Sequence, residues 1–140
     1  MHKNFIHKVK VYYEDTDAGG VVYYANYLNF LERARTEAIT SIGLSNKKIK
    51  ENFGTQIIVK SCNIEYKKSA HLEDELSIRS SVKDITRTSF SIKQIISRKD
   101  DVITEALVHL VFVNNLGKPT KIPDLIYENF KPYFCDSIKI

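Results

Sequence analysis

Residues 26–43 read NYLNFLERARTEAITSIG, and their apolar side chains recur at intervals of three and four. This spacing predicts a long amphipathic helix whose apolar stripe faces a core. Asn26 is suited to cap its first turn, and Gly43 to adopt the left-handed conformation just past its end. The residues of the predicted buried face are Tyr27, Phe30, Leu31, Ala34, Ala38 and Ile42.

Strand-like runs lie on both sides of this helix. Their apolar residues alternate with polar ones, and turn residues separate them. The expected strands cover residues 5–13, 55–66, 75–83, 89–97 and 102–113. Residues 45–54 are read as a polar loop, and Pro123 as the start of a short helix that Pro132 ends.

This order of elements predicts an α+β fold, with a five-stranded antiparallel sheet packed on one long helix and a short C-terminal helix. With 140 residues and no linker or repeat, the chain is expected to form one domain over residues 1–140. We expect Val108, Leu110 and Phe112 on an edge strand that meets a second copy. Self-association to a dimer or tetramer follows as a prediction.

Composition excludes several classes of protein. Hydrophobic residues make up 43% and charged residues 27%, which is ordinary for a globular chain, and no apolar run is long enough to span a membrane. Basic residues are scattered over separate loops, which argues against a nucleic-acid groove although the net charge is +4. The four histidines lack zinc-ligand spacing, so no metal site is expected. Cys62 is predicted to lie in the core and Cys135 in a C-terminal tail. Two cysteines placed in this way predict a cytoplasmic protein without disulfides.

The segment with the most chemical content is residues 13–27, YEDTDAGGVVYYANY. Its acidic residues precede Gly19 and Gly20, which leave backbone N–H groups accessible, and a helix N-terminus follows. We expect Asp17 to face these N–H groups across a cleft. A carboxylate held there can act as a general base or a nucleophile on a carbonyl whose oxygen the N–H groups bind. The pattern favours a neutral ester, thioester or amide, because Asp17 would repel an anionic ligand.

The same residues also allow a purely structural interpretation. Acids before a helix are commonly caps, and Gly-Gly is commonly a turn. Calcium binding by Glu14, Asp15 and Asp17 lacks the usual loop spacing and closing Glu.

Residues 11–27, VYYEDTDAGGVVYYANY, together with residues 31–37, LERARTE, resemble hotdog-fold acyl-CoA thioesterases of the 4-hydroxybenzoyl-CoA thioesterase type. They are most similar to the tol–pal-associated branch. The resemblance implies hydrolysis of an acyl-CoA thioester to free acid and CoA, with no cofactor beyond the CoA of the substrate. It implies acyl-CoA, or an acyl carrier protein as the alternative carrier, as the partner.

The resemblance also implies roles for single residues. Asp17 matches the catalytic carboxylate, the backbone N–H of Tyr24 matches the group that polarises the carbonyl, and Tyr13 matches the tyrosine at the head of the motif. Gly20 belongs with them as the residue that shapes the loop. Residues that contact the pantetheine or phosphates of CoA are expected at Arg87, Thr88 and Ser89.

One residue departs from the pattern, because the tol–pal-associated branch usually has His where this chain has Tyr24. A backbone N–H survives that exchange, but an imidazole function does not. Two alternatives remain open: a hotdog dehydratase acting on acyl-carrier-protein thioesters, and a non-catalytic protein that binds an acyl carrier or an envelope-assembly partner.

Overall fold

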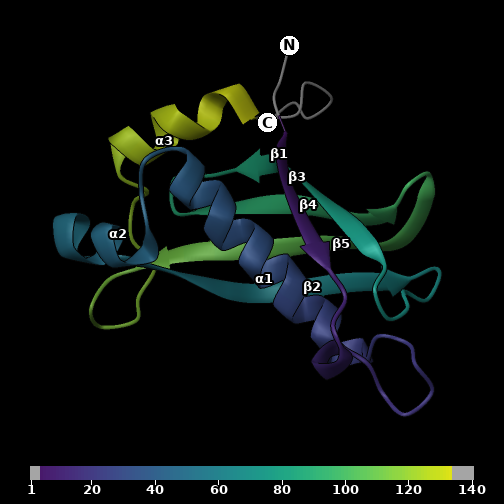
Figure 1. The fold of residues 1–140 in the computed structure, drawn as a ribbon. Coiled ribbons are helices and arrows are strands. Elements are labelled where there is room, and N and C mark those ends of the chain that lie inside the picture. Colours follow the sequence, from purple (N-terminus) through teal and green to yellow (C-terminus); the bar gives the residue numbers. More distant parts are fainter. Residues whose placement is uncertain (1–3, 134–140) are drawn as a thin grey trace.

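The computed structural model describes residues 4–133. Its elements in chain order are β1 (Phe5–Lys10), the 3₁₀ turn η1 (Tyr13–Asp15), α1 (Tyr24–Ser41), α2 (Asn46–Phe53), β2 (Gln56–Tyr66), β3 (Glu75–Ile85), β4 (Ser89–Arg98), β5 (Asp101–Val113), α3 (Asp124–Phe130) and the 3₁₀ turn η2 (Lys131–Tyr133). The strands form one five-stranded antiparallel sheet in the order β1-β3-β4-β5-β2. The sheet curls around α1, which crosses its concave face (Figure 1). This confirms the predicted α+β hotdog arrangement.

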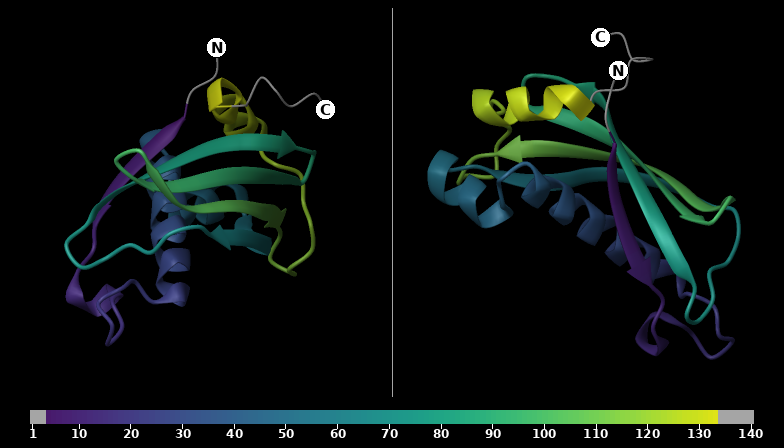
Figure 2. Two further views of the ribbon diagram at one scale, coloured as in Figure 1. Left: turned by 90° about the vertical axis from the view of Figure 1, so that its right-hand side faces the viewer. Right: turned by 45° about the horizontal axis from the view of Figure 1, so that its top comes forward.

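The apolar stripe of α1 follows the prediction except at its end, where Ile39 is buried and Ile42 lies just past the helix and is only partly buried. Phe30 and Leu31 have no exposed surface, and Tyr27, Ala34 and Ala38 are also buried against the sheet. Burial of a side chain the size of Phe or Leu contributes about 1.5–3 kcal/mol relative to leaving it in water. The two alanines let the helix approach the sheet closely. Figure 2 shows the resulting single layer of helix along the curved strands.

A polar contact is embedded in this apolar interface at Gln94 of β4. Gln94 is fully buried, and its Nε2 donates to the Leu31 carbonyl (3.1 Å) and to Ser80 Oγ (3.0 Å). Its Oε1 accepts a hydrogen bond from Arg35 Nη1 at 2.9 Å. Every polar group of the buried amide therefore has a partner, and together these bonds fix α1 on β3 and β4.

The prediction that residues 102–113 form an edge strand is wrong. Val108, Leu110 and Phe112 lie on β5, which is flanked by β4 and β2, and all three are buried. The edges are β1 and β2, because the chain after β2 crosses to the far side of the sheet before β3 begins. Strand order in the chain does not reveal this crossover.

Cys62 is also misplaced by the sequence interpretation. It lies on the edge strand β2 and is exposed. The other cysteine, Cys135, lies outside the described residues.

Residues 45–54 contain a helix where a polar loop was predicted. The Ser45 hydroxyl accepts the Lys48 N–H to cap α2, and Gly54 ends it with a φ of +67°. Ile49 and Phe53, one turn apart, pack on the core, and this pair was the overlooked sign of a helix.

The ends of two further elements differ from the prediction. The first strand stops at Lys10, and Tyr13–Asp15 turn away from the sheet as η1. α1 begins at Tyr24, so Asn26 lies inside the helix instead of capping it, whereas Gly43 does take a φ of +85° just past its end. α3 follows Pro123 as predicted, and Pro132 lies in η2 instead of ending α3.

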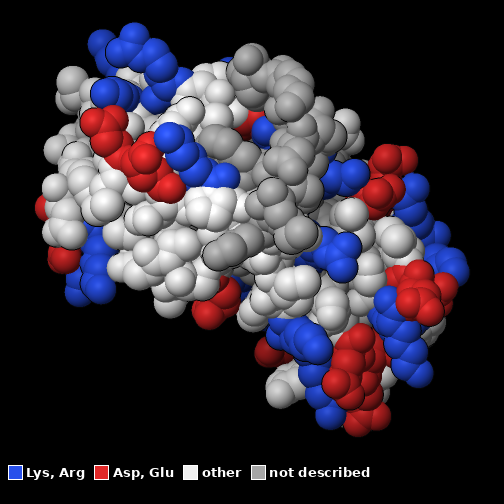
Figure 3. Space-filling model, turned by 90° about the horizontal axis from the view of Figure 1, so that it is seen from above, with Lys and Arg blue, Asp and Glu red and all other residues white. Residues whose placement is uncertain are grey.

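Charged side chains of both signs alternate on the face seen from above, with no continuous basic stripe there (Figure 3).

Within residues 4–133, none of the helices has the length and apolar character needed to cross a bilayer.

Replacing Gln94 with Leu tests the buried amide contact. We expect Gln94→Leu to lower the free energy of unfolding by about 2–3 kcal/mol, because Ser80 Oγ and the Arg35 guanidinium lose their partner in a dry site. Urea denaturation followed by circular dichroism measures the loss. Lys93→Leu, at the neighbouring and partly exposed position, should change stability by less than about 0.5 kcal/mol. An equal loss in both variants would contradict the assignment.

Candidate active site

The loop that carries Asp17 is held in shape by its own backbone. Thr16 and Val22 pair as an isolated antiparallel bridge, and inside it Asp17 N–H donates to the Val21 carbonyl at 2.9 Å. Gly20 N–H donates to the Asp17 carbonyl at 3.1 Å, and Gly20 has a φ of +81°. A side chain at Gly20 would be strained in this conformation, which glycine adopts readily.

The Asp17 carboxylate accepts the Gly19 N–H at 2.8 Å. A Cβ at Gly19 would lie 3.3 Å from Asp17 Oδ1, so glycine leaves room for the carboxylate here. The Asp17 side chain lines a cleft but is exposed in the single chain. Its second carboxylate oxygen is therefore accessible to a ligand or to water.

Asp15 has a different role from Asp17, and the sequence did not distinguish it. It is 6% exposed; Oδ2 accepts the Tyr12 N–H at 2.9 Å, and Oδ1 accepts from Asn26 Nδ2 at 2.6 Å. Its carbonyl also accepts the Tyr23 N–H. Asp15 thus joins the end of the first strand to the first turn of α1 and sets the position of Asp17 between them.

The N-terminus of α1 opens onto the same cleft. Tyr24 is the first helical residue, and the preceding Tyr23 provides no side-chain cap. Within residues 4–133 no hydrogen bond uses the N–H groups of Tyr24 or Ala25. Free N–H groups at the positive end of a helix dipole bind anions and developing oxyanions.

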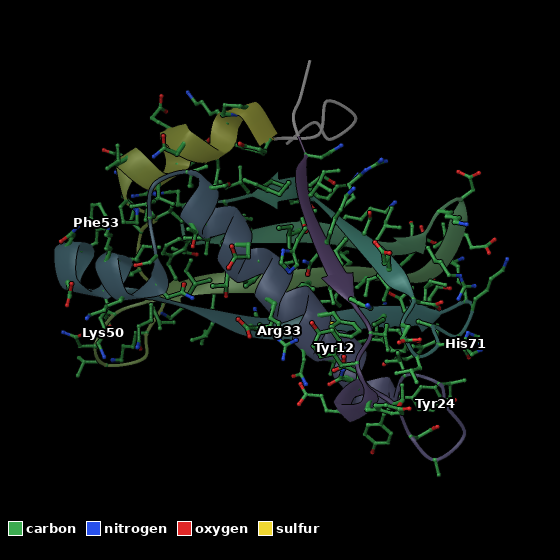
Figure 4. The ribbon with its side chains drawn as sticks, viewed as in Figure 1. Tyr12, Tyr24, Arg33, Lys50, Phe53 and His71 are labelled. Atoms are coloured by element: carbon green, nitrogen blue, oxygen red, sulfur yellow. The ribbon has the colours of Figure 1, made fainter. Side chains whose placement is uncertain are left out.

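The cleft holds about 360 Å³ and combines the Asp17 loop, the start of α1 and the end of β2. Its lining residues are Asp17, Val21, Val22, Tyr23, Tyr24, Tyr27, Tyr66, Lys67, Lys68 and Ser69. The expected pair of a carboxylate and a helix N-terminus thus shares one cleft. Figure 4 places Tyr24 and His71 at this end of the molecule, and Lys50 and Phe53 at the other.

Three tyrosines form the apolar wall. The ring of Tyr66 lies 5.1 Å from that of Tyr24 and 5.6 Å from that of Tyr27, measured between centroids. Burial raises the pKa of both Tyr27 and Tyr66, so their phenols are neutral near pH 7. The sequence interpretation missed Tyr66, although its place at the end of a strand with Ile64 two residues before it indicated which face it shares.

Two lysines stand on the rim of the cleft. Lys67 Nζ lies 3.0 Å from Glu105 Oε2, and Lys68 Nζ lies 2.8 Å from Asp101 Oδ1. The hydrogen bond to Glu105 raises the pKa of Lys67, which keeps it cationic. Both lysines can attract an anionic ligand toward the cleft at long range.

The remaining predicted residues lie elsewhere in the single chain. Tyr13 is 81% exposed and lines a separate cleft with Tyr12 and Glu14. Arg87, Thr88 and Ser89 lie in or beside the turn between β3 and β4. β3 starts beside the Asp17 end and runs about 30 Å to that turn, given a rise of ~3.3 Å per residue. Arg87 there lines a groove with Lys121 and Tyr127.

Among residues 4–133, no group of three His, Cys, Asp or Glu side chains is arranged to hold a metal ion. The cleft's chemistry is that of one carboxylate, unbonded helix N–H groups and neutral phenols. Such a set suits attack on a neutral carbonyl compound whose oxygen gains negative charge.

Comparison with known proteins agrees with this chemistry. The sequence profile described as the thioesterase-like superfamily matches residues 11–130. "Acyl-CoA thioesterase YbgC" of Haemophilus influenzae is 36% identical over 118 residues, covering 84% of this chain and 86% of the relative. "Acyl-CoA thioester hydrolase YbgC" of Escherichia coli O6:H1 is 38% identical over 125 residues, covering 88% and 92%.

Solved structures share the fold. A probable thioesterase from Bartonella henselae superposes with a TM-score of 0.83 at 27% identity, covering 86% of this chain and all of that one. A 1,4-dihydroxy-2-naphthoyl-CoA thioesterase from Synechocystis has a TM-score of 0.85 at 22% identity, covering 92% and 96%.

The buried carboxylate of Asp15 gives a prediction about stability. Asp15→Ala should lower the free energy of unfolding by about 2–3 kcal/mol, because it removes hydrogen bonds to a charged group and leaves the Tyr12 N–H unpaired. Thermal and urea unfolding measure the effect. Glu14→Ala, at the exposed neighbouring acid, is the matched control and should stay within about 0.5 kcal/mol of the wild type. A stable Asp15→Ala protein would show that the loop is held by other contacts.

Proposed function

The chain belongs to the thioesterase-like superfamily and is a thioester hydrolase, and we propose that it hydrolyses an acyl-CoA in the Asp17 cleft to a free acid and CoA. The observation that carries the proposal is the shared cleft of Asp17 and the α1 N-terminus. Names of the relatives support acyl-CoA as the substrate class. An acyl carrier protein is the alternative carrier of the same thioester.

In the proposed reaction the thioester carbonyl oxygen faces the N–H groups of Tyr24 and Ala25. Asp17 takes a proton from a water molecule as its oxygen attacks the carbonyl carbon, and the tetrahedral oxyanion is held by those N–H groups. The C–S bond then breaks, and CoA leaves as a thiolate that takes up the proton. In the alternative route, Asp17 itself attacks and forms a mixed anhydride that water hydrolyses. Neither route requires a metal or redox cofactor.

Tyr24 takes part through its backbone, so a tyrosine side chain in place of the usual histidine leaves the oxyanion contact intact. Its ring packs at a tilt against that of Tyr66, with the centroids 5.1 Å apart, and lines the cleft that would hold the acyl group. Gly20 acts by shaping the loop, and we assign no direct contact with substrate to Tyr13.

We also propose that the working enzyme contains a second copy joined through β2. This edge strand is eleven residues long and contains neither proline nor glycine, and nearly all of its side chains are exposed. Ile58 is 44% and Val59 49% exposed. An unpaired apolar edge of this kind is a template for strand pairing. At the other edge, β1 is protected in part, because Phe5 is buried and stacks on Tyr133.

Antiparallel pairing of two β2 strands would bring together the two distant parts of the predicted site. The Tyr66 end of β2 lies at the Asp17 cleft, and the Gln56 end pairs with Val113 near the β3–β4 turn. A two-fold axis at the middle of β2 reverses these ends. Arg87 of the partner subunit would then lie toward the Asp17 cleft, where a basic side chain suits the phosphates of CoA.

The motif in residues 11–27 supports placement in the 4-hydroxybenzoyl-CoA thioesterase type and its tol–pal-associated branch, which we include in the proposal. A cytoplasmic location fits an acyl-CoA substrate.

Replacing Asp17 tests the mechanism. Asp17→Asn keeps the shape of the side chain but removes the base or nucleophile, so kcat should fall at least 100-fold. Release of free thiol from acetyl-, hexanoyl-, palmitoyl- and benzoyl-CoA measures it, and the panel also reveals the acyl preference. Glu14→Gln, an exposed acid outside the cleft, should keep wild-type turnover.

Near-full turnover by Asp17→Asn would overturn the assignment of that residue. If the wild type itself released no thiol from any of these substrates but eliminated water from a 3-hydroxyacyl thioester, the dehydratase would be favoured. Tight binding of an acyl carrier protein without turnover would favour the non-catalytic alternative.

The β2 interface gives a second prediction. Val59→Asp places a charge on the exposed edge without disturbing a buried side chain, so it should convert the dimer to monomers of 16.1 kDa and reduce turnover with it. Analytical ultracentrifugation measures the mass. Ile6→Asp, at an equally exposed position of the other edge strand, is the matched control and should remain dimeric. Dimers in both variants would exclude β2 as the contact.

A further inference from the structure

One wall of the Asp17 cleft is the loop between β2 and β3, residues 67–74. Lys67, Lys68 and Ser69 line the cleft directly. Further along, the loop pairs with the backbone of the Asp17 loop: Val22 N–H donates to the Ala70 carbonyl at 2.9 Å, and Leu72 N–H donates to the Gly20 carbonyl at 3.4 Å. The position of the Asp17 loop therefore depends on residues 67–74.

The same loop is tied to α1 through a single hydroxyl. Ala70 is fully buried, and its N–H donates to the Tyr27 hydroxyl at 3.0 Å. The three parts of the cleft, namely the Asp17 loop, the start of α1 and residues 67–74, thus meet around Ala70. Because both backbone groups of this buried residue are hydrogen-bonded, a shift of the loop acts on the Asp17 loop and on α1 together.

Arg98, at the end of β4, holds this loop from behind. Its Nη1 donates to Asp74 Oδ2 at 2.7 Å and to the Ser69 carbonyl at 3.1 Å, and Nη2 lies 3.6 Å from Asp101 Oδ2. Asp74 Oδ2 also accepts the His71 N–H at 2.8 Å. Arg98 therefore clamps the loop near both of its ends, while it does not itself line the cleft.

We propose that Arg98 is a positioning residue for hydrolysis, acting through Asp74 and the Ser69 carbonyl to hold residues 67–74 against the Asp17 loop. The inference rests on the proposed function of the cleft. It extends that function to a residue at the end of β4 that does not line the cleft.

The Arg98–Asp74 contact is suited to this task. Only 24% of the Arg98 side chain and 22% of the Asp74 side chain are exposed, so solvent screens the pair less than a surface ion pair. Burial alone would raise the pKa of Asp74, but the hydrogen bonds from Arg98 and from the His71 N–H outweigh it and hold the pKa below its usual 3.8. The guanidinium group of Arg98 donates hydrogen bonds to the Asp74 carboxylate and to the Ser69 carbonyl at once. The ammonium group of a lysine is less suited to holding two acceptors in fixed directions.

The test compares Arg98→Ala and Arg98→Lys with Arg79→Ala, an exposed arginine of the neighbouring strand β3. Steady-state turnover is measured on the acyl-CoA that the wild type hydrolyses fastest, normalised to the folded fraction at a temperature well below unfolding. We expect kcat to fall about 10- to 100-fold in Arg98→Ala, since displacement of a catalytic group by about 1 Å costs up to 10²-fold. KM should change less than threefold, Arg98→Lys should lie between, and Arg79→Ala should match the wild type.

A double-mutant cycle separates positioning from general destabilisation. If Arg98 acts through Asp74, Asp74→Asn combined with Arg98→Ala should lower kcat no further than the more severe single variant does. Additive losses would overturn the proposal, and so would wild-type kcat per folded molecule in Arg98→Ala.

Hydrogen exchange provides a readout that needs no substrate. The amides of Val22, Ala70 and Leu72 should exchange faster in Arg98→Ala, or in Arg98→Lys if the alanine variant does not fold, while amides in the middle of α1 stay protected. Unchanged exchange would contradict the clamp. Asp17→Asn is measured in parallel. Full turnover by Asp17→Asn would contradict the proposed function. An inactive Asp17→Asn together with a fully active Arg98→Ala would contradict only the role of Arg98.

Discussion

The geometry of the site depends on one buried carboxylate. Asp15 accepts hydrogen bonds from the backbone where the first strand ends and from Asn26 in the first turn of α1. The intervening residues are thereby closed into a short loop with Asp17 near its middle. Packing of α1 against the sheet fixes the direction of the helix, and Asp15 fixes where its N-terminus lies relative to the loop. The Asp17 carboxylate and the N-terminus of α1 therefore line one cleft, and the position of each depends on Asp15.

The parts that local pattern determines were predictable from the sequence. The spacing of apolar residues in α1 and their alternation in β3 and β4 specify the faces that these elements bury. Gly20 has a positive φ that few other residue types adopt. The separate roles of Asp15 and Asp17 were not predictable, because both are aspartates in one loop and only tertiary contact buries the first. The edge position of β2 was equally hidden, since it follows from a crossover and not from any property of residues 56–66. Cys62 was assigned to the core for the same reason.

The candidate site extends over more of the chain than its motif does. Tyr66 comes from the edge strand, and Ala70 connects the Asp17 loop to the helix through Tyr27. These residues lie about forty positions beyond Tyr27, and they meet the motif because the loop between β2 and β3 bonds to the Asp17 loop and to Tyr27 of α1. The residues proposed to carry the chemistry lie in one short segment, whereas the residues that hold them in position come from several parts of the chain.

The crossover after β2 also bears on how the chain is made. Within the described part of the chain β2 pairs only with β5, and Gln56 lies opposite Val113. During synthesis at about 5–20 residues per second, β2 therefore emerges several seconds before its partner strand exists. During that interval neither edge of β2 is hydrogen-bonded to its partner strand. Such long-range pairing also slows folding compared with local hairpins, so the nascent chain is most exposed to misassociation before its last long strand is complete.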